Sequence, residues 1–395
     1  MNILYVTGMF FNNRHETIQG GMVKAVFMNA YGMQERGHHV TILTVDSKDS
    51  VWRYKGIRVV SVQTDIYWSQ KSNLFKAISI VEREWKLEKK IRELAKQEKI
   101  DVIQYTGWFG IGLFHSKIPA IMRISSYTKA QLSSCYSRTT VSLLSFFERC
   151  AARRMNAIYG PSNIMAKALE NDIRRKVYVI ETPFVKEDVE EDDFFLRTKL
   201  YDKKYVLFFS RLSEDKGIGI IRDCIYDVLK RYDEIYFVFA GGGKRDISQE
   251  ILSAAKECKN RVIFLGSISH EKLYPVIRKA EIILMPSLKD NFPNSCAEAM
   301  SLHKIVIGAE DSSLEQFITD GYNGFLIQNG SSDSLKNKIE HVLQMNEKDK
   351  KIICSRTQEK INELDPQKYF TTVENLMRSV IEREKRHEIR RQYRQ

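Results

Sequence analysis

A regular alternation of short apolar runs with longer amphipathic stretches constrains the fold of this chain more than any other feature. Residues 235–240, IYFVFA, are one such run, and residues 217–232 are the amphipathic stretch before it. Short β-branched strands separated by helices form parallel sheets that carry helices on both faces. The chain is therefore predicted to have an α/β fold.

The alternation also predicts the individual elements. The expected strands are residues 3–7, 40–45, 57–62, 101–105, 120–124, 157–159, 177–180, 205–210, 235–240, 262–265, 282–285, 305–308 and 325–327. The expected helices are residues 22–36, 73–98, 143–155, 217–232, 247–259, 271–279, 295–302 and 313–319, followed by a helical remainder.

With 395 residues, the chain is too long for one ordinary core and suits two domains of similar size. An acidic stretch without a clean period interrupts the alternation, so we expect a linker at 183–200. We expect one Rossmann-like domain at 1–182, a second at 201–367, and a last helix at about 368–395 that packs back on the first. The two domains are expected to face each other across a cleft at the carboxyl ends of their strands, where such sheets bind ligands.

Composition excludes several classes of protein. No run of 18 uncharged apolar residues exists, so no transmembrane helix is expected. The N-terminus, MNILYVTGMF, lacks a basic segment and a cleavage site, and is interpreted as a first strand rather than a signal peptide. The six cysteines are scattered without a CxxC pair, which indicates reduced thiols. We therefore expect a cytoplasmic protein.

The formal net charge of +12 is unevenly distributed. Residues 123–154 contain six basic residues against one acid, and residues 382–395 contain six against three. Nucleic acid, an anionic membrane surface or an anionic acceptor would each explain this excess, and solvated helix faces are the simpler alternative. No recognition motif such as RNP1 or a zinc finger accompanies the charge, which argues against nucleic acid as a partner.

One loop after a predicted strand carries cations suited to a diphosphate. In SRLSEDKG, residues 210–217, Arg211 and Lys216 could neutralise the phosphates, and arginine can do so bidentately. The alternative is a surface loop in which Glu214 and Asp215 offset these two cations.

A second loop, SLKDNFPNSCAE at residues 287–298, leads into a helix. Ser295 and Glu298 have the spacing of a capping box, which is the structural interpretation. In the functional interpretation, Glu298 accepts hydrogen bonds from ribose hydroxyls, and free N–H groups near residues 294–297 receive phosphate. Taken with the first loop, these groups suit a nucleotide diphosphate-sugar.

Glycines and one tryptophan give weaker indications. Gly20 and Gly21 lie between a strand and a helix, where a missing Cβ lets the backbone approach a phosphate, although tight turns also use such pairs. Residues 241–243 are GGG and either form a permissive turn or contact the nucleotide through Gly242. The pattern is not GxGxxG, which argues against a dinucleotide cofactor and a dehydrogenase. Trp108 is a candidate for stacking on a sugar, with core packing as the commoner alternative.

The sequence gives no reason to expect a metal or another cofactor. It contains no HxxxH or CxxC pattern and no D-x-D pair in a loop after a strand. Positive side chains and helix dipoles would then have to stabilise a departing diphosphate.

Six segments in order resemble one family of enzymes. They are GGMVKAVFMNAYGMQERGHHVTILT, FERCAARRMNAIYGPSNIMAKAL, SRLSEDKGI, RVIFLGSISHEKLYPVIRKAEIILMPS, DNFPNSCAEAMSLHKIVIGA and DGYNGFLI. Through them the chain resembles, nearly end to end, the retaining glycosyltransferases of the GT-B fold in glycosyltransferase family 4 (glycosyl transferases group 1). The resemblance implies two Rossmann-like domains and a nucleotide diphosphate-sugar as donor.

The resemblance also implies roles for side chains of the C-terminal domain. Arg211 and Lys216 would bind the donor diphosphate and stabilise it as the leaving group. Asp290 would lie near the donor sugar, where it replaces the usual glutamate and has a shorter reach. Glu298 would hold the ribose.

Main-chain contacts to the donor follow from the same resemblance. Asn294 and Ser295 would contact the sugar or phosphate through their backbone, and Ile268 would meet the base. Gly20 and Gly21 would approach the diphosphate from the N-terminal domain.

The N-terminal domain departs from the family pattern. The family usually offers a histidine after the strand expected at 120–124, and Ser125 or Ser126 stands there in this chain. Arg123, Ser125 and Trp108 are the candidate residues on the acceptor side, and no chemistry is assigned to Arg123.

These inferences predict a metal-independent hexosyltransferase that moves a sugar to a hydroxyl acceptor with retention of configuration. The expected acceptor is a growing cell-surface glycan or a lipid-linked saccharide in polysaccharide biosynthesis, which would place the enzyme peripherally at the inner face of the plasma membrane. A GT-B nucleotide-sugar epimerase is the alternative, and a basic nucleic-acid-binding protein is a distant one.

Overall fold

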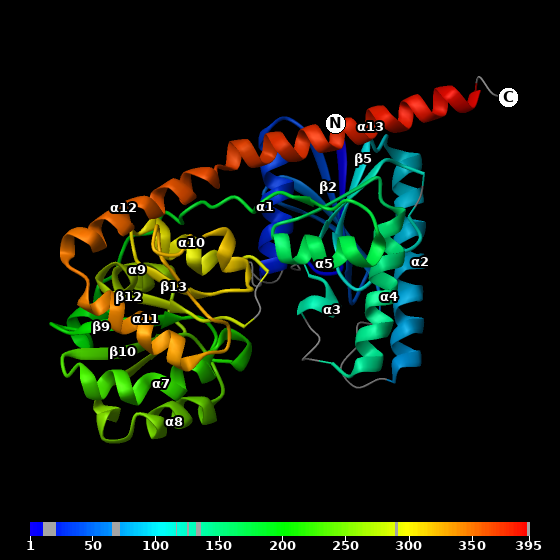
Figure 1. The fold of residues 1–395 in the computed structure, drawn as a ribbon. Helices are drawn as coiled ribbons and strands as arrows, with labels where there is room; N and C mark the ends of the chain where they lie inside the picture. Colours follow the sequence, from blue (N-terminus) through cyan, green and yellow to red (C-terminus); the bar gives the residue numbers. More distant parts are fainter. Residues whose placement is uncertain are drawn as a thin grey trace. The chain divides into compact units, whose positions relative to one another are not determined.

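The computed structural model describes residues 1–10, 21–64, 72–115, 117–124, 126–131, 136–288 and 291–392. The chain forms two compact units, one of residues 1–182 with 367–395 and one of residues 183–366 (Figure 1). Each unit has its own sheet and its own buried apolar core.

The described residues of the first unit form an eight-stranded sheet in the order β3-β4-β2-β1-β5-β6-β7-β8. Neighbouring strands are parallel except β3 and β4, which form an antiparallel pair at one edge. From β4 onward, this is the doubly wound order that α/β sheets with helices on both faces adopt. The strands are β1 Asn2–Val6, β2 His39–Asp46, β3 Ser50–Tyr54, β4 Ile57–Gln63, β5 Val102–Gly107, β6 Ala120–Ile124, β7 Ala157–Gly160 and β8 Tyr178–Val179.

Helices cover both faces of this sheet. They are α1 Gly21–Glu35, α2 Asn73–Gln97, α3 Thr128–Gln131, α4 Arg138–Arg154, α5 Asn163–Ile173 and α13 Pro366–Gln392. On one face, α2, α4 and α5 bury Leu87, Ala151 and Leu169 in a shared core. On the other face, α1 and α13 bury Met33 and Met377 in a second core.

The last helix, α13, packs closely on α1. Gly32 leaves room for this contact, because a Cβ at that position would lie 2.0 Å from Cζ of Phe370. The Tyr369 hydroxyl donates a 2.8 Å hydrogen bond to Oδ1 of Asn29, a buried polar contact between the two helices. The C-terminal segment therefore completes the first unit, although the whole second unit lies between the two parts in the chain.

The described residues of the second unit form a six-stranded sheet in the order β11-β10-β9-β12-β13-β14, with all neighbours parallel. The strands are β9 Lys204–Phe209, β10 Ile235–Ala240, β11 Val262–Gly266, β12 Ile282–Met285, β13 Val306–Ala309 and β14 Phe325–Ile327. The helices are α6 Phe194–Thr198, α7 Ile218–Arg231, α8 Arg245–Ala254, α9 His270–Lys279, α10 Asn294–Ser301, α11 Ser332–Gln344 and α12 Glu347–Glu363, with 3₁₀ turns at Glu214–Lys216, Lys256–Arg261 and Ser313–Gln316. This strand order is the Rossmann order, which reverses direction between β9 and β12.

The α/β fold class predicted from the sequence is confirmed, with local differences. The helix expected at 313–319 is only a short 3₁₀ turn, and the helix expected at 247–259 stops at Ala254. β3, α3, α5 and α6 have no counterpart among the expected elements. Residues 183–200, the expected linker, belong to the second unit, where Phe195 and Leu196 pack against its core. The expected cleft between the two domains stays a prediction.

Candidate active site

The predicted donor-binding residues gather at one edge of the six-stranded sheet. Because its strands are parallel, their carboxyl ends lie at the same edge. The loop after β9 carries Arg211 and Lys216, the loop after β10 carries Gly242, and the loop after β11 carries Ile268. The loop after β12 leads into α10, so the sequence motifs that are far apart in the chain converge here.

Main-chain hydrogen bonds join these loops to one another. The N–H of Leu212 donates to the carbonyl of Gly242 at 2.9 Å, and the N–H of Gly241 donates to Gly266 at 2.8 Å. The N–H of Leu288 donates to the carbonyl of Asp215 at 3.1 Å. The edge is therefore a connected platform, which is the rigid support that a binding site requires.

Two glycines allow the close contacts within this platform. Gly241 has φ +154°, and a Cβ there would lie 1.9 Å from the carbonyl oxygen of Ser210. Gly217 has φ +75°, and a Cβ there would lie 1.8 Å from the carbonyl oxygen of Pro286. The need for close packing thus explains why a glycine stands at position 241, as the permissive-turn interpretation expects. Gly242 is exposed beside Ser267.

The guanidinium of Arg211 is exposed to solvent at this edge of the sheet. Its side chain is 74% exposed, and its Nη2 lies 3.4 Å from Oδ2 of Asp215. The surface interpretation predicted such an ion pair, but an exposed pair contributes only about 0–1 kcal/mol, so phosphate can replace the carboxylate. Lys216 is half-buried at the end of the 3₁₀ turn Glu214–Lys216, further along the same loop.

The capping-box interpretation of Ser295 and Glu298 is wrong. α10 begins at Asn294 with Pro293 as its N-cap, and the cap makes no side-chain hydrogen bond. Ser295 is therefore inside the helix, where its Oγ lies 3.9 Å from Sδ of Met285. The first turn of α10 carries no acid, so its N–H groups and positive dipole end remain suited to an anion.

Glu298 contacts a histidine that sequence reasoning missed. His270, the first residue of α9, lies between two carboxylates: its Nδ1 is 2.7 Å from Oε2 of Glu187, and its Nε2 is 3.5 Å from Oε1 of Glu298. The hydrogen bond with Glu298 raises the pKa of His270 above its ordinary value, and Glu187 adds to the effect. His270 therefore places an imidazole beside the Glu298 carboxylate. Its position directly after the GSIS segment was the available signal.

Three predicted site residues, Gly20, Ser125 and Asp290, lie outside the described residues. Gly21 is the first residue of α1, is exposed, and has nothing within 4 Å of an added Cβ. The roles assigned to these four residues stay predictions.

In the first unit, the loop after β5 carries Trp108. Its ring lies 4.6 Å from that of Phe109, and a Cβ on Gly8 would lie 2.6 Å from it, so core packing explains this half-buried tryptophan well. Two charged residues of α2 form hydrogen bonds with the main chain of this loop. Arg83 donates to the carbonyl of Phe109 at 2.7 Å, and Glu84 accepts from the N–H of Gly112 at 2.7 Å.

Arg123, another acceptor-side candidate, is buried. Its Nη2 donates a 2.9 Å hydrogen bond to Oγ1 of Thr182. The basic run at 123–154 is therefore not one exposed patch. Two of its other cations lie beside a single carboxylate instead: Lys129 and Arg149 are 2.8 and 3.9 Å from the oxygens of Asp172.

Glu148 of α4 is a buried carboxyl group that joins two loops at the carboxyl edge of the first sheet. It accepts hydrogen bonds from the N–H and hydroxyl of Thr128, at 3.0 and 2.8 Å, and a longer one from the N–H of Phe109, at 3.4 Å. It also lines a small cavity with Trp108 and Tyr127. Burial raises the pKa of Glu148 to about 7. In the sequence, Glu148 was noted only as the single acid in the basic run 123–154, and nothing there indicated that it would be buried.

The residues that the structure describes contain no cluster of three or more histidine, cysteine or acidic residues arranged to hold a metal ion. Across the same residues, no helix combines the length and apolar character needed to cross a membrane.

Two family models match the chain. The model of the glycosyl transferases group 1 matches residues 189–358, and that of glycosyltransferase family 4 matches residues 19–185. Together they span both units, which have the doubly wound sheets of the GT-B glycosyltransferases. The chain belongs to the glycosyl transferases group 1.

Curated relatives support this assignment at low identity. The alpha-D-kanosaminyltransferase of Streptomyces kanamyceticus is 22% identical over 57% of this chain and 61% of its own length. One component of the human phosphatidylinositol N-acetylglucosaminyltransferase is 23% identical over 81% of this chain and 64% of its own length. The chain thus spans less than two-thirds of each of these two proteins.

Solved structures share the fold. Sucrose-phosphate synthase from Thermosynechococcus elongatus matches with a TM-score of 0.76 at 15% identity, covering 96% of this chain and 99% of that one. HepE from Anabaena, crystallised with UDP, matches with a TM-score of 0.69 at 17% identity, covering 96% and 100%.

Proposed function

We propose that the protein transfers a hexose-type sugar from a nucleotide diphosphate-sugar to a hydroxyl acceptor, with retention of configuration and without a metal. The observation that carries the proposal is the convergence of Arg211, Lys216, Gly242 and Ile268 with the start of α10 at one sheet edge. Membership of the glycosyl transferases group 1 supports it.

The donor diphosphate would bind between the Arg211 loop and the amino end of α10. Arg211 and Lys216 would offset its negative charge, and the first N–H groups of α10, near Asn294 and Ser295, would donate to phosphate oxygens. Glu298, with the histidine beside it, would accept hydrogen bonds from the ribose hydroxyls. Because HepE is solved with UDP, a uridine diphosphate donor is the first to test.

Transfer would proceed on one face of the donor sugar. The acceptor oxygen forms a bond to the anomeric carbon as the bond from that carbon to the β-phosphate oxygen breaks. The diphosphate leaves with the bonding electron pair, and its β-phosphate oxygen takes the acceptor proton. Arg211 and Lys216 would stabilise the charge that develops on the diphosphate, which is the largest catalytic contribution such a site can make. Asp290 would lie near the donor sugar.

The acceptor is proposed to be a growing cell-surface glycan or a lipid-linked saccharide at the cytoplasmic face of the membrane. The human relative is named for transfer to phosphatidylinositol, and a Salmonella relative is named for transfer to lipopolysaccharide, which supports a lipid-linked acceptor. The chain's net charge of +12 also suits an anionic acceptor or surface.

A thermal-shift panel of UDP-, GDP-, ADP- and dTDP-sugars tests donor binding. One base series should raise the melting temperature, and Arg211→Ala and Glu298→Ala should each abolish the rise. Arg231→Ala is the matched control, because this exposed arginine also forms an ion pair, 2.6 Å from Glu340, but ends α7 at the opposite edge of the sheet. Loss of the shift in all three variants, or in none, would count against the assigned site.

Product analysis then tests the reaction. The stabilising donor is incubated with and without candidate acceptors, and the anomeric configuration of the product is read by NMR. Retention in an acceptor-dependent product is expected. An altered free nucleotide-sugar in the absence of acceptor would contradict the proposal and indicate an epimerase.

A further inference from the structure

Helix α2 carries an apolar stripe that faces solvent. Leu74, Ile78, Val81 and Trp85 have relative exposures of 69%, 53%, 40% and 58%. Their spacings of four, three and four residues place all four within an arc of about 60° on the helix surface. Phe75, beside this stripe at the first turn, is also exposed.

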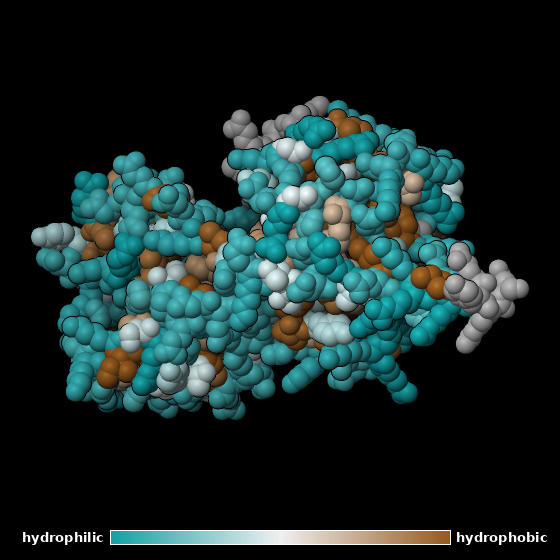
Figure 2. Space-filling model, turned by 90° about the horizontal axis from the view of Figure 1, so that it is seen from above, coloured by the Kyte–Doolittle hydropathy of each residue, from teal (hydrophilic) through white to brown (hydrophobic). Residues whose placement is uncertain are grey.

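This stripe is distinct from the face that α2 uses in folding. Ile80, Leu87 and Ile91 are buried within the first unit, on another side of the helix. A helix that only covers a sheet has one apolar face and a polar remainder, so the second stripe is not explained by the fold. Hydrophilic residues cover most of the molecular face in Figure 2, which is the ordinary situation for a protein surface. A contiguous exposed apolar stripe marks an interaction surface.

Toward the carboxyl end of α2, the same stripe changes from apolar to basic. Lys89, Arg92 and Lys96 follow Trp85 at spacings of four, three and four residues, and the Lys89 ammonium lies 5.7 Å from the Trp85 ring centroid. With Trp85, these three cations line an open groove that Phe114 also borders.

Acids offset only part of this charge. Glu88 pairs with Arg92 at 2.9 Å, and Glu93 pairs with Lys90, which is off the stripe, at 3.1 Å. In the described part of the chain, no carboxylate forms an ion pair with Lys89 or Lys96.

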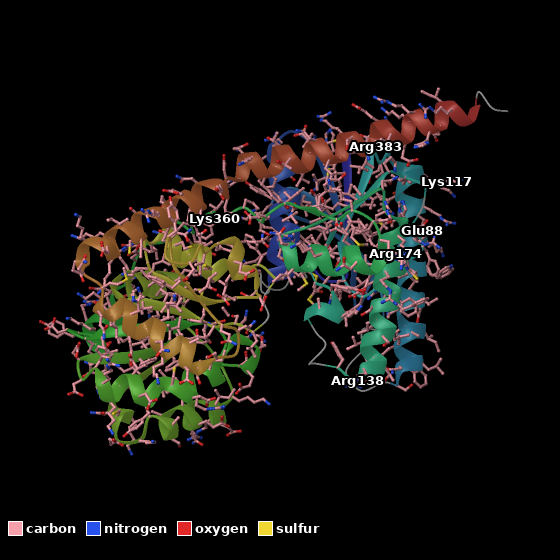
Figure 3. The ribbon with its side chains drawn as sticks, viewed as in Figure 1. Glu88, Lys117, Arg138, Arg174, Lys360 and Arg383 are labelled. Atoms are coloured by element: carbon pink, nitrogen blue, oxygen red, sulfur yellow. The ribbon has the colours of Figure 1, made fainter. Side chains whose placement is uncertain are left out.

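The stripe lies beside the carboxyl edge of the first sheet. Ile80 of α2 and Leu144 of α4 cluster with Phe109, which lies in the loop after β5. The first turns of the two helices therefore extend past that loop, and the Asn73 side chain joins them by hydrogen bonds of 3.0 and 2.7 Å to Thr139 and Thr140. Figure 3 shows this end of α4 at Arg138, away from α13, and Figure 1 shows α2 beside α4.

We propose that this face of α2, from Leu74 to Lys96, docks on an anionic phospholipid bilayer. The apolar half enters the boundary between headgroups and acyl chains, where tryptophan is favoured, and the basic half binds lipid phosphates. The juxtaposition favours a bilayer over a protein partner, because the cores of protein interfaces are depleted in lysine, whereas a membrane presents phosphates directly beside an apolar phase. The inference deepens the proposed function, since it brings a lipid-linked acceptor to the loop after β5.

Vesicle flotation of the full-length protein tests this surface without donor or acceptor. Binding to vesicles that contain phosphatidylglycerol should exceed binding to pure phosphatidylcholine vesicles and should weaken at high salt. Lys89→Gln with Lys96→Gln should lower the partition coefficient about 25-fold, from about fivefold for each lysine. Ile78→Ser with Trp85→Ser should lower it about tenfold or more.

Matched controls lie on the second unit. Lys348→Gln with Lys351→Gln removes two exposed cations from α12, and Tyr201→Ser removes a side chain that is 70% exposed. These variants should bind vesicles as the unmodified protein does. Quenching of tryptophan fluorescence by brominated lipids should occur in the unmodified protein and fall strongly in Trp85→Phe.

The proposal is overturned if the unmodified protein binds neutral and anionic vesicles equally or binds neither. It is also overturned if the α2 variants bind as well as the controls, or if they alter self-association and leave vesicle binding unchanged. Donor-induced thermal stabilisation of the α2 variants is measured in parallel and should persist. Vesicle binding without sugar transfer would refute the proposed function alone, and transfer without vesicle binding would refute this surface alone.

Discussion

Replacing Glu148 with glutamine should remove a large part of the pH dependence of the first unit's stability. The Glu148 carboxyl is buried and joins Thr128 to Phe109, and burial raises its pKa to about 7. In Glu148→Gln, the side-chain oxygen can still accept from the Thr128 N–H, while the new amide donates to the Thr128 hydroxyl. Only the longest of the three hydrogen bonds, to Phe109, is lost.

The sign and size of the effect follow from the shifted pKa. The pKa of Glu148 in the folded protein lies above its ordinary value of 4.5, so its contribution to stability is complete below pH 4.5 and is lost as the pH rises through about 7. Between pH 5 and pH 8, the unmodified protein should lose roughly 2 to 3 kcal/mol that Glu148→Gln keeps. For a unit of this size, that corresponds to a relative shift of about 1 M in the urea midpoint.

Tryptophan fluorescence is the appropriate assay. All four tryptophans, at positions 52, 68, 85 and 108, belong to the first unit, so their signal in urea reports its unfolding alone. Comparing the two proteins at each pH cancels groups that both share, including His115, whose pKa burial lowers to about 4. A difference in stability between the two proteins that stays constant from pH 5 to pH 8 would contradict the raised pKa of Glu148.

Three further predictions concern the second unit. Gly217→Ala should destabilise it by about 3 kcal/mol or more, because the Cβ would collide with the Pro286 carbonyl. Gly330→Ala, with φ +80° and open space, should cost only about 1 kcal/mol. Urea titrations followed by far-UV circular dichroism, which also reports the second unit, measure both. Donor affinity, measured by calorimetry, should fall as the pH rises through the raised pKa of His270. His270→Gln should flatten this pH profile. A profile that stays unchanged in the variant would show that the pair with Glu298 does not affect donor binding. Donor binding and transfer should persist in excess EDTA, and a loss that Mg²⁺ restores would contradict metal independence.

Much of the fold could be predicted because the strands of parallel sheets are apolar on both faces. Strand β10, IYFVFA, is almost entirely buried and is unmistakable in the sequence. Strand β3 was missed because it lies at an edge and buries no residue fully, and its hairpin turn uses Lys55 and Gly56, both with positive φ. Such a turn is usually recognised by an Asn-Gly pair, and this one has Lys-Gly instead, so the signal in the sequence was weak.

The candidate site was predicted only as far as local motifs reach. Arg211 follows a strand in the sequence, so its place at the sheet edge could be expected. The contact between His270 and Glu298 joins two helices that are distant in the chain, and only the tertiary fold reveals it. The capping-box interpretation of Ser295 was wrong because the N-cap of α10 is Pro293, so the helix begins earlier than a capping box at Ser295 requires.

The proposed function requires that the donor diphosphate bind at the carboxyl edge of the second sheet. A crystal structure with UDP or the stabilising nucleotide-sugar tests it most directly. Phosphate oxygens are expected within hydrogen-bonding distance of Arg211 and Lys216, with the first N–H groups of α10 directed at them. Phosphates bound away from this edge, with Arg211 still paired to Asp215, would contradict it.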